Sequence, residues 1–184
     1  MANQFSQTVY FPLRQDGSDG AKKIVPFLGN WKLGTYRRGY GWHTGVDWIM
    51  NRPDRGLAEP VFAMADGVVI DSSPTLSAIG YGNLVYIQHP QLGVFSRYAH
   101  LQSRSVNTGQ VVKAGQVIGH LGKSGTDNTH LHFDIPTKPL PWSRYWPGIS
   151  DNVATRQNIQ AAFADPIWWL AGQQAKNPTG LVMT

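Results

Sequence analysis

Residues 129–135, THLHFDI, place two histidines two positions apart in a stretch that otherwise reads as a buried strand. Alternate residues of a strand point to the same face, so His130 and His132 project together while Leu131 and Phe133 point into a core. Two imidazoles on one face are either ordinary, partly buried polar residues or part of a functional site. The rest of the chain is needed to choose between these interpretations.

Short strands and turns follow one another through the middle of the chain. Segments rich in Val, Ile, Tyr and Phe are separated by turn residues, and the 184 residues include 20 glycines and 12 prolines. This spacing predicts a mainly β fold built on an antiparallel sheet or sandwich. The expected strands are residues 45–50, 60–65, 67–72, 83–89, 94–100, 116–122 and 130–135.

The flanking regions predict less regular structure. The N-terminal region is rich in turn formers, with an exposed loop expected at 14–23 (RQDGSDGAKK). Several Pro and Trp residues in 136–150 exclude a central strand and indicate a long surface loop. The one short C-terminal helix that we expect covers 152–164, with Ser150 or Asp151 as its N-cap.

Composition narrows the classes of function. Lys and Arg number 16 against 11 Asp and Glu, and the net charge of +5 favours anionic partners. The basic residues are dispersed, so a nucleic-acid-binding β-barrel would lack a basic stripe, and we expect no nucleic-acid partner. The chain has no cysteine, so a metal would be held by His and carboxylate side chains.

Targeting signals give little information. No apolar run approaches the length of about 20 residues that a membrane-spanning helix needs. Residues 1–17, MANQFSQTVYFPLRQDG, lack the basic and apolar regions of a signal peptide. For an exported protein, this pattern implies a removed signal or another route of delivery.

The six histidines include a pair of potential metal ligands with a nearby carboxylate. His43 and Asp47 are four positions apart in GWHTGVDW, and one ring of the 129–135 motif would complete a set of two imidazoles and one carboxylate. Three protein ligands with one open position are typical of catalytic zinc, which lowers the pKa of a bound water to near 7. The His-Glu-x-x-His helix of zincins is absent, so non-ligand histidines would have to transfer protons. His100 and the other ring of the motif are available for this role.

The ordered set of motifs resembles the catalytic domain of the M23 metallopeptidases, the lysostaphin and LytM-like endopeptidases of bacterial peptidoglycan. The resemblance covers roughly residues 40–170. It rests on HTGVD (43–47), YAHL (98–101), GQVVKAGQVIGHLGKSG (109–125), GKSGTDNTHLHFDI (122–135) and ADPIWWL (164–170). We therefore expect a single domain, 1–184, whose catalytic core at about 40–170 has a LytM-like fold with an open groove. Residues 1–39 would be an N-terminal extension and 171–184 a short tail.

The resemblance also implies a role for each site residue. His43, Asp47 and His132 would be the ligands of one Zn²⁺ per chain, and His100 and His130 would be the catalytic pair. The family often has a tyrosine shortly before the first ligand that contacts the transition state. Tyr36 and Tyr40 are both candidates for this substrate-binding residue, and the spacing does not choose between them.

Other residues near the motifs have two interpretations each. Asp134 shares a face with both histidines and would either orient a ring or end the strand in a hydrogen bond. Ser124 and Gly125 are candidates for shaping the groove through their backbone. His89 and His120 are interpreted as structural. The loops 73–83 and 136–150 are candidate groove walls, with a packed loop core as the alternative.

The function that the resemblance implies is a zinc metalloendopeptidase that hydrolyses peptide cross-links or bridges of peptidoglycan. The partners would be peptidoglycan peptides, without a membrane span, and the protein would act outside the cytoplasm as a monomer. It would be secreted, periplasmic or phage-delivered. The alternative is a catalytically silent M23-like module that binds or activates other cell-wall hydrolases. Nothing in the sequence chooses between Gly-Gly bridges and D-Ala cross-links.

Overall fold

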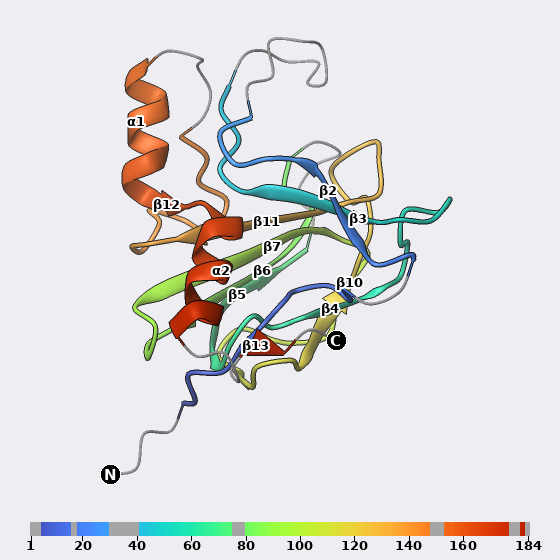
Figure 1. Cartoon of the computed structure of the whole chain (residues 1–184), viewed down its shortest axis with the longest axis horizontal. Coiled ribbons are helices and arrows are strands. Elements are labelled where there is room, and N and C mark those ends of the chain that lie inside the picture. Colours follow the sequence, from blue (N-terminus) through green and yellow to red (C-terminus); the bar gives the residue numbers. More distant parts are fainter. Residues whose placement is uncertain are drawn as a thin grey trace.

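The computed structural model describes residues 5–15, 18–29, 41–74, 80–147, 153–176 and 181–182, and the fold is mainly β (Figure 1). The strands are β1 Val9–Tyr10, β2 Ala21–Val25, β3 Val46–Met50, β4 Pro60–Phe62, β5 Gly67–Ser73, β6 Asn83–His89, β7 Val94–Leu101, β8 Ser103–Arg104, β9 Val111–Val112, β10 Val117–His120, β11 Leu131–Pro136, β12 Phe163–Ala164 and β13 Leu181–Val182. The helices are α1 Val153–Ala162 and α2 Pro166–Lys176.

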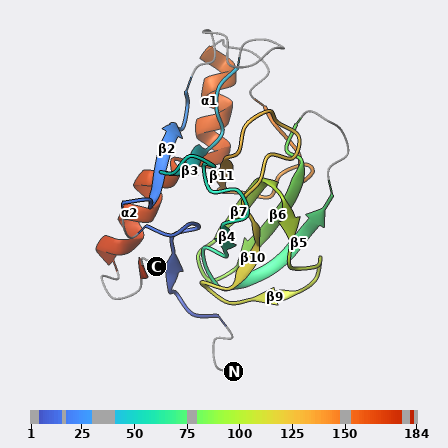
Figure 2. The same ribbon diagram turned by 90° about the vertical axis from the view of Figure 1, so that its right-hand side faces the viewer.

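One large antiparallel sheet organises the molecule. Its strand order is β2-β3-β11-β7-β6-β5-β9, and β12 pairs with β11. A smaller sheet has the order β4-β10-β8, while β1 and β13 form a separate parallel pair. Figure 2 shows α1 and α2 on the same side of the molecule, away from β4, β9 and β10.

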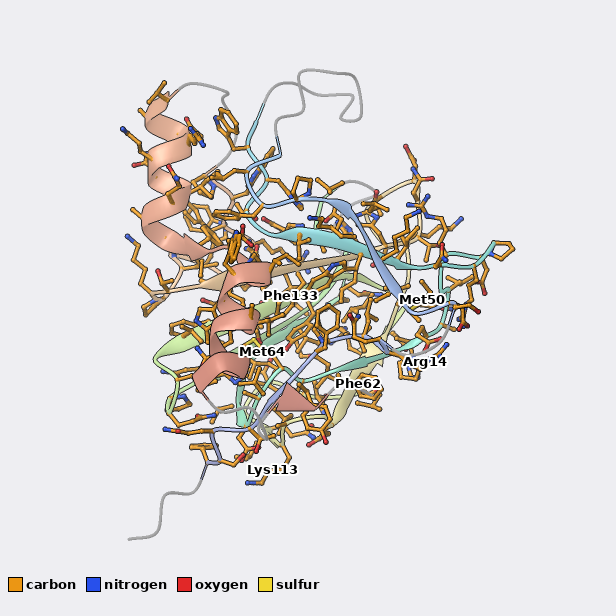
Figure 3. All side chains as sticks on the ribbon, in the orientation of Figure 1. Arg14, Met50, Phe62, Met64, Lys113 and Phe133 are labelled. Carbon is orange, nitrogen blue, oxygen red and sulfur yellow. The ribbon has the colours of Figure 1, made fainter. Side chains whose placement is uncertain are left out.

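The three adjacent strands β3, β11 and β7 separate a core face from a polar face. On the core face, the ring of Phe133 stacks on Trp48 at 5.6 Å and contacts Tyr98 at 5.2 Å between centroids. Figure 3 shows Phe133 and Met64 in the interior and Lys113 at the periphery. On the opposite face, His132 lies across from Asp47 of β3 and from Ala99 of β7. The register of β11 therefore sets which side chains meet on the polar face.

A glycine permits the close pairing of β3 and β11. A Cβ on Gly45 would lie 2.1 Å from the carbonyl oxygen of Phe133 and 2.6 Å from the Cβ of Asp134. Both distances are shorter than any real contact, so a side chain here would push the two strands apart. Gly45, inside the HTGVD motif, thus lets the strand that carries Asp47 approach the strand that carries His132.

The predicted fold class is confirmed, and each of the seven expected strands is present. Those expected at 60–65 and 116–122 are shorter, Pro60–Phe62 and Val117–His120, and the others differ by at most one residue at each end. The loop predicted at 136–150 contains no helix or strand over its described part, 137–147. The expected helix is α1, and its suggested caps, Ser150 and Asp151, lie outside the described residues.

Two predictions for the flanking regions were wrong. The exposed loop at 14–23 gives way at Ala21 to strand β2, which forms an edge of the large sheet and exposes Lys22 and Lys23 to solvent. A second helix, α2, follows α1 and runs through the start of the supposed tail to Lys176. The signal for α2 was present in Asp165 and Pro166. The Asp165 carboxylate accepts the N–H of Ile167 at 2.9 Å, and Pro166 occupies the first helical position.

Candidate metal centre and active site

Three predicted ligands meet on the polar face of the large sheet. His43 lies just before β3, Asp47 lies on β3, and His132 lies on β11. The Nε2 atom of His43 is 2.9 Å from Nδ1 of His132 and 3.0 Å from Oδ1 of Asp47. The third distance, from His132 Nδ1 to Asp47 Oδ1, is 3.1 Å. All three side chains are buried, so their donor atoms are brought together away from bulk water.

The outer ring nitrogens of both histidines are committed to acceptors. His43 Nδ1 lies 3.0 Å from the carbonyl oxygen of Pro26, and His132 Nε2 lies 3.0 Å from Oδ2 of Asp134. A carbonyl and a carboxylate only accept, so each of these nitrogens carries the proton of the neutral ring. The inner atoms, His43 Nε2 and His132 Nδ1, are then lone pairs facing each other and the Asp47 carboxylate. This arrangement is repulsive unless a cation or a proton lies between the three atoms.

The residues fit zinc in chemistry and in size. Tetrahedral zinc with bonds of about 2.0–2.1 Å to nitrogen and oxygen separates neighbouring ligand atoms by about 3.3 Å. The observed separations of 2.9, 3.0 and 3.1 Å are within a few tenths of that value. Two imidazole nitrogens and one carboxylate oxygen are also the donor set of catalytic zinc sites that leave one position open.

The electrostatics of the cluster agree with this geometry. Burial alone would raise the pKa of Asp47, but His43 and His132 hold it well below its usual range. Burial alone would lower the pKa of His132, but hydrogen bonds to Asp134 and Asp47 raise it to about 9. The site therefore holds a full negative charge on Asp47 and attracts a positive charge to the space between the three residues.

His100 and His130 form a second pair next to the ligands. Their ring centroids are 4.5 Å apart, and His130 Nε2 lies 3.8 Å from Oδ2 of Asp47. His100 Nδ1 donates to the carbonyl oxygen of Ser124 at 2.9 Å, and His130 Nδ1 donates to that of Asn128 at 2.9 Å. Each ring is thus fixed in the tautomer that leaves Nε2 as a base.

Burial keeps both rings of this pair neutral. Desolvation, together with the nearby His130 and His132, holds the pKa of His100 well below its usual range. Desolvation also lowers the pKa of His130, against the opposing effect of Asp47. Both imidazoles are therefore unprotonated at Nε2 at neutral pH.

The backbone of His100 has an uncommon conformation. Its φ of 61° lies in the left-handed region, where few non-glycine residues occur. The conformation is held by the His100 N–H, which donates to the carbonyl oxygen of Tyr81 at 2.8 Å. Strained backbone of this kind persists where the surrounding structure fixes it, and it clusters at functional sites.

The structure places Asp134 behind His132, a predicted metal ligand. Its Oδ2 atom accepts from His132 Nε2 at 3.0 Å and from the Thr44 hydroxyl at 2.9 Å, and the side chain is fully buried. Burial alone would raise the pKa of Asp134, but Arg97 and His132 lower it to about 2. Of the two interpretations of Asp134 from sequence, these contacts favour the one in which it orients a ring.

Sequence reasoning missed three residues that build the surroundings of His132. Thr44 and Arg97 both bond to Asp134, and the Tyr81 ring lies 5.4 Å from the His132 ring. Burial raises the pKa of Tyr81 to about 12, so its hydroxyl stays protonated. Arg97 carried a signal in the sequence, since it is a charged residue in the middle of a predicted strand.

Of the other residues singled out from the sequence, those that the structure describes lie outside the cluster of three predicted ligands. Tyr36 and Tyr40 lie outside the described residues. The Ser124 hydroxyl donates to the carbonyl oxygen of Leu101 at 2.6 Å and accepts the Asn83 N–H at 2.8 Å, which fixes the carbonyl that His100 uses. His120 contacts Ser103, and His89 lies in the core, so neither is part of the metal cluster.

Among the residues described, no helix is long and apolar enough to cross a membrane.

The chain matches the family model described as peptidase family M23 over residues 41–141. It is 36% identical over 104 residues to the murein hydrolase activator NlpD of Escherichia coli, covering 56% of this chain and 25% of that protein. It is 40% identical over 94 residues to the peptidoglycan DD-endopeptidase ShyC of Vibrio cholerae, covering 50% of this chain and 20% of that protein.

The chain spans a quarter or less of the length of these two relatives. Among solved structures, it is similar to the catalytic domain of the antimicrobial peptidase lysostaphin from Staphylococcus simulans. The TM-score is 0.55 and the identity 28%, with 82% of this chain and 92% of that one covered. The resemblance to lysostaphin-like peptidases that the motifs suggested is confirmed by these matches.

Proposed function

The chain belongs to peptidase family M23, and from this premise we propose that it is a zinc metalloendopeptidase that cleaves peptide cross-links or bridges of peptidoglycan. His43, Asp47 and His132 hold one zinc ion. His100 and His130 transfer protons. The substrate class is supported by a relative named as a peptidoglycan endopeptidase and by the net charge of +5, which suits an anionic wall.

The proposal rests on three atoms that face the same point, His43 Nε2, His132 Nδ1 and Asp47 Oδ1. The contacts of His43 with Pro26 and of His132 with Asp134 leave an unshared pair on each inner nitrogen. These two atoms and the Asp47 carboxylate are buried within 3.1 Å of one another. Without a cation, a proton on His132 Nδ1 fills this place, because the pKa of His132 is raised to about 9. Zinc would displace that proton and would be held by the same three atoms.

The chain's own residues supply the proton transfers. Zinc at this site would supply a Lewis acid and make hydroxide available near neutral pH. His100 and His130 are neutral, and each presents an unprotonated Nε2. One ring accepts the proton of the attacking water, and a protonated ring then donates to the amine that leaves. The fixed Nδ1–H bonds to backbone carbonyls keep both rings in orientation while the proton moves.

The second candidate function is a module that activates other cell-wall hydrolases. A relative named as a murein hydrolase activator supports it. The intact set of five residues supports the endopeptidase instead, because a module without catalysis does not need three acceptors around a cation and two basic rings. Under either function, we propose that the protein acts outside the cytoplasm, where peptidoglycan lies, and as a monomer.

A digest of purified sacculi tests the proposal. Sacculi from several wall types are incubated with the protein, with and without a zinc chelator, and the released peptides are read by mass spectrometry. We expect a new amine end that disappears with the chelator and returns when zinc is restored. The identity of that end names the bond. If the folded, zinc-loaded protein cleaves no wall but stimulates a hydrolase added to the same digest, the activator function replaces the endopeptidase.

A further inference from the structure

Arg97 of β7 is fully buried and uses all five of its N–H donors. Two of them bind the Asp134 carboxylate, through Nε at 3.1 Å and through Nη2. The other Nη2 donor reaches the Tyr81 hydroxyl at 2.9 Å. The two Nη1 donors go to the backbone carbonyl oxygens of Ser143 and Tyr145, each at 2.9 Å. A single guanidinium thus joins β11 to the loop 141–147.

The same contacts lead from the loop to the metal cluster in two steps. Arg97 bonds to Asp134, and Asp134 accepts from the outer nitrogen of His132. Hydrogen bonds of this kind fix the orientation and tautomer of a metal-ligating ring. Arg97 therefore holds the loop directly and, through Asp134, the ring of His132.

The loop that Arg97 holds contains no helix or strand of its own and carries an exposed aromatic side chain. Trp142 is 60% exposed, and its ring packs edge-on against Tyr145 at 5.0 Å. Arg144 adds a second anchor by donating to the carbonyl oxygen of Gly82 at 2.8 Å. Among the described residues, the Arg97 anchor reaches His132 through one side chain, Asp134, while Trp146 Nε1 donates to the carbonyl oxygen of Trp42 at 3.3 Å, next to His43.

Lysine could not replace the guanidinium. An ammonium group offers a point charge without the planar fork that reaches a carboxylate on one side and two carbonyls on the other. A buried ion pair also contributes little net stability compared with apolar packing of the same volume. The geometry therefore indicates a role in positioning rather than in stability.

We propose that Arg97 is a positioning residue that couples metal binding at His132 to the order of the loop 141–147, an inference that rests on the proposed zinc site. Because coupling between two sites is reciprocal, zinc bound at the cluster orders the loop, and an ordered loop strengthens zinc binding. Contact of the loop with substrate would then reach the metal site through Arg97.

Hydrogen exchange read by mass spectrometry tests the coupling without any assay of activity. The wild-type protein is compared before and after addition of zinc alone. Exchange in 141–147 should slow by about 5-fold or more with zinc, in the range of typical coupling energies. Peptides from 105–115, at the far edge of the large sheet, should not change. Unchanged exchange in 141–147 for a protein that has bound zinc overturns the proposal.

A variant assigns the coupling to Arg97. R97K should still bind zinc, but exchange in 141–147 should be fast and independent of the metal. The matched control is R104K, since Arg104 also donates to a backbone carbonyl, that of Ser72 at 2.6 Å, and lies in the smaller sheet. R104K should keep the zinc-dependent protection. Retained protection in R97K, or an equal acceleration in every peptide, assigns Arg97 a structural role only and overturns the proposal.

These outcomes are distinguishable from failure of the proposed function. A protein that binds zinc and shows the coupling but cleaves no sacculus supports the inference and contradicts the endopeptidase. A protein that cleaves sacculi but shows no coupling supports the endopeptidase and contradicts the inference. If cleavage is observed, R97K should raise KM more than it lowers kcat, because the loop rather than the reacting atoms is displaced.

Discussion

His130 and His132 point to one site but present opposite ring nitrogens to it. His132 directs Nδ1 inward because Asp134, two residues along the same strand, takes its Nε2–H. His130 uses Nδ1 to reach the carbonyl oxygen of Asn128, which leaves Nε2 on the inner side. The strand period places both rings on one face, while the neighbouring acceptor decides what each ring can do. Under the proposed function, a ligand and a base thus arise from two identical side chains.

Replacement of His132 should abolish zinc retention. H132A removes one of three ligand atoms and leaves the buried Asp134 without a partner on that side. We expect loss of both stoichiometric zinc and hydrolysis, measured by elemental analysis after desalting and by the sacculus digest. H120A is the matched control, because His120 contacts Ser103 away from the cluster. Stoichiometric zinc and normal turnover in H132A would remove His132 from the ligand set.

Replacement of His100 should separate catalysis from metal binding. H100A leaves His43, Asp47 and His132 in place, so zinc content should be unchanged. Loss of a positioned acid or base should lower kcat by about 10²–10⁴-fold. The measurement is zinc content together with the rate of release of new amine ends. Loss of zinc from H100A would show that the ligand and acid-base roles are assigned the wrong way round.

At the scale of elements, pairing of β11 with both β3 and β7 determines which residues meet. The pairs His132–Asp47 and Asp134–Arg97 follow directly from that register. A shift of one residue would turn every side chain of β11 to the other face and replace His132 by Leu131 or Phe133. The apolar residues between the polar ones therefore hold the register as well as the core.

Removal of the cap of α2 should destabilise the protein without affecting the site. The Asp165 carboxylate accepts the N–H groups of Ile167 at 2.9 Å and Trp168 at 3.4 Å. D165A should lower the free energy of unfolding by about 1 kcal/mol. The measurement is urea denaturation, with Q160A on the exposed face of α1 as the control. If D165A changes the free energy of unfolding no more than Q160A does, α2 is held by packing of its apolar residues, such as Leu170 and Trp169, rather than by its cap.

The sequence predicted the elements better than their contacts. Apolar segments between turn residues located seven strands, and the order of the histidine motifs identified the cluster that the structure assembles. Strand β2 was missed because its exposed Lys22 and Lys23 resemble a loop. The role of Arg97 could not be predicted because its partners lie 16 to 48 residues away. The strand register and the path of the loop bring them together, and no local pattern encodes either.

At the scale of the whole molecule, the flanking segments complete the core of the central region. Val9 and Leu13 from the N-terminal segment and Leu170 from α2 are buried in the same hydrophobic cluster as Phe133 and Tyr98. Strand β13 pairs in parallel with β1, so Leu181 and Val182 lie beside Val9 and Tyr10. We therefore expect the N-terminal segment to unfold together with the sheet rather than independently of it.

Stability of the whole molecule should fall in mild acid because of one core histidine. His89 is fully buried, with Nδ1 2.8 Å from the carbonyl oxygen of Asp66 and Nε2 2.7 Å from the Ser96 hydroxyl. Burial lowers its pKa to about 4. Between the unfolded value of about 6.5 and the folded value, the unfolded chain binds a proton that the folded chain does not. The stabilisation that buried, neutral His89 gives the fold is complete above about pH 6.5 and is lost as the pH falls toward 4.

A shift of this size corresponds to about 3 kcal/mol of unfolding free energy. Urea denaturation of the wild type and H89Q at intervals between pH 7 and pH 4 measures it. H89Q should be less stable than the wild type at pH 7, because the bond to Ser96 is disturbed. The difference in free energy of unfolding between the two proteins should become smaller as the pH falls. Repetition at two salt concentrations separates this local effect from general charge repulsion, which salt screens. Parallel curves for the two proteins would mean that His89 is protonated in the fold and that another group is responsible for the acid sensitivity.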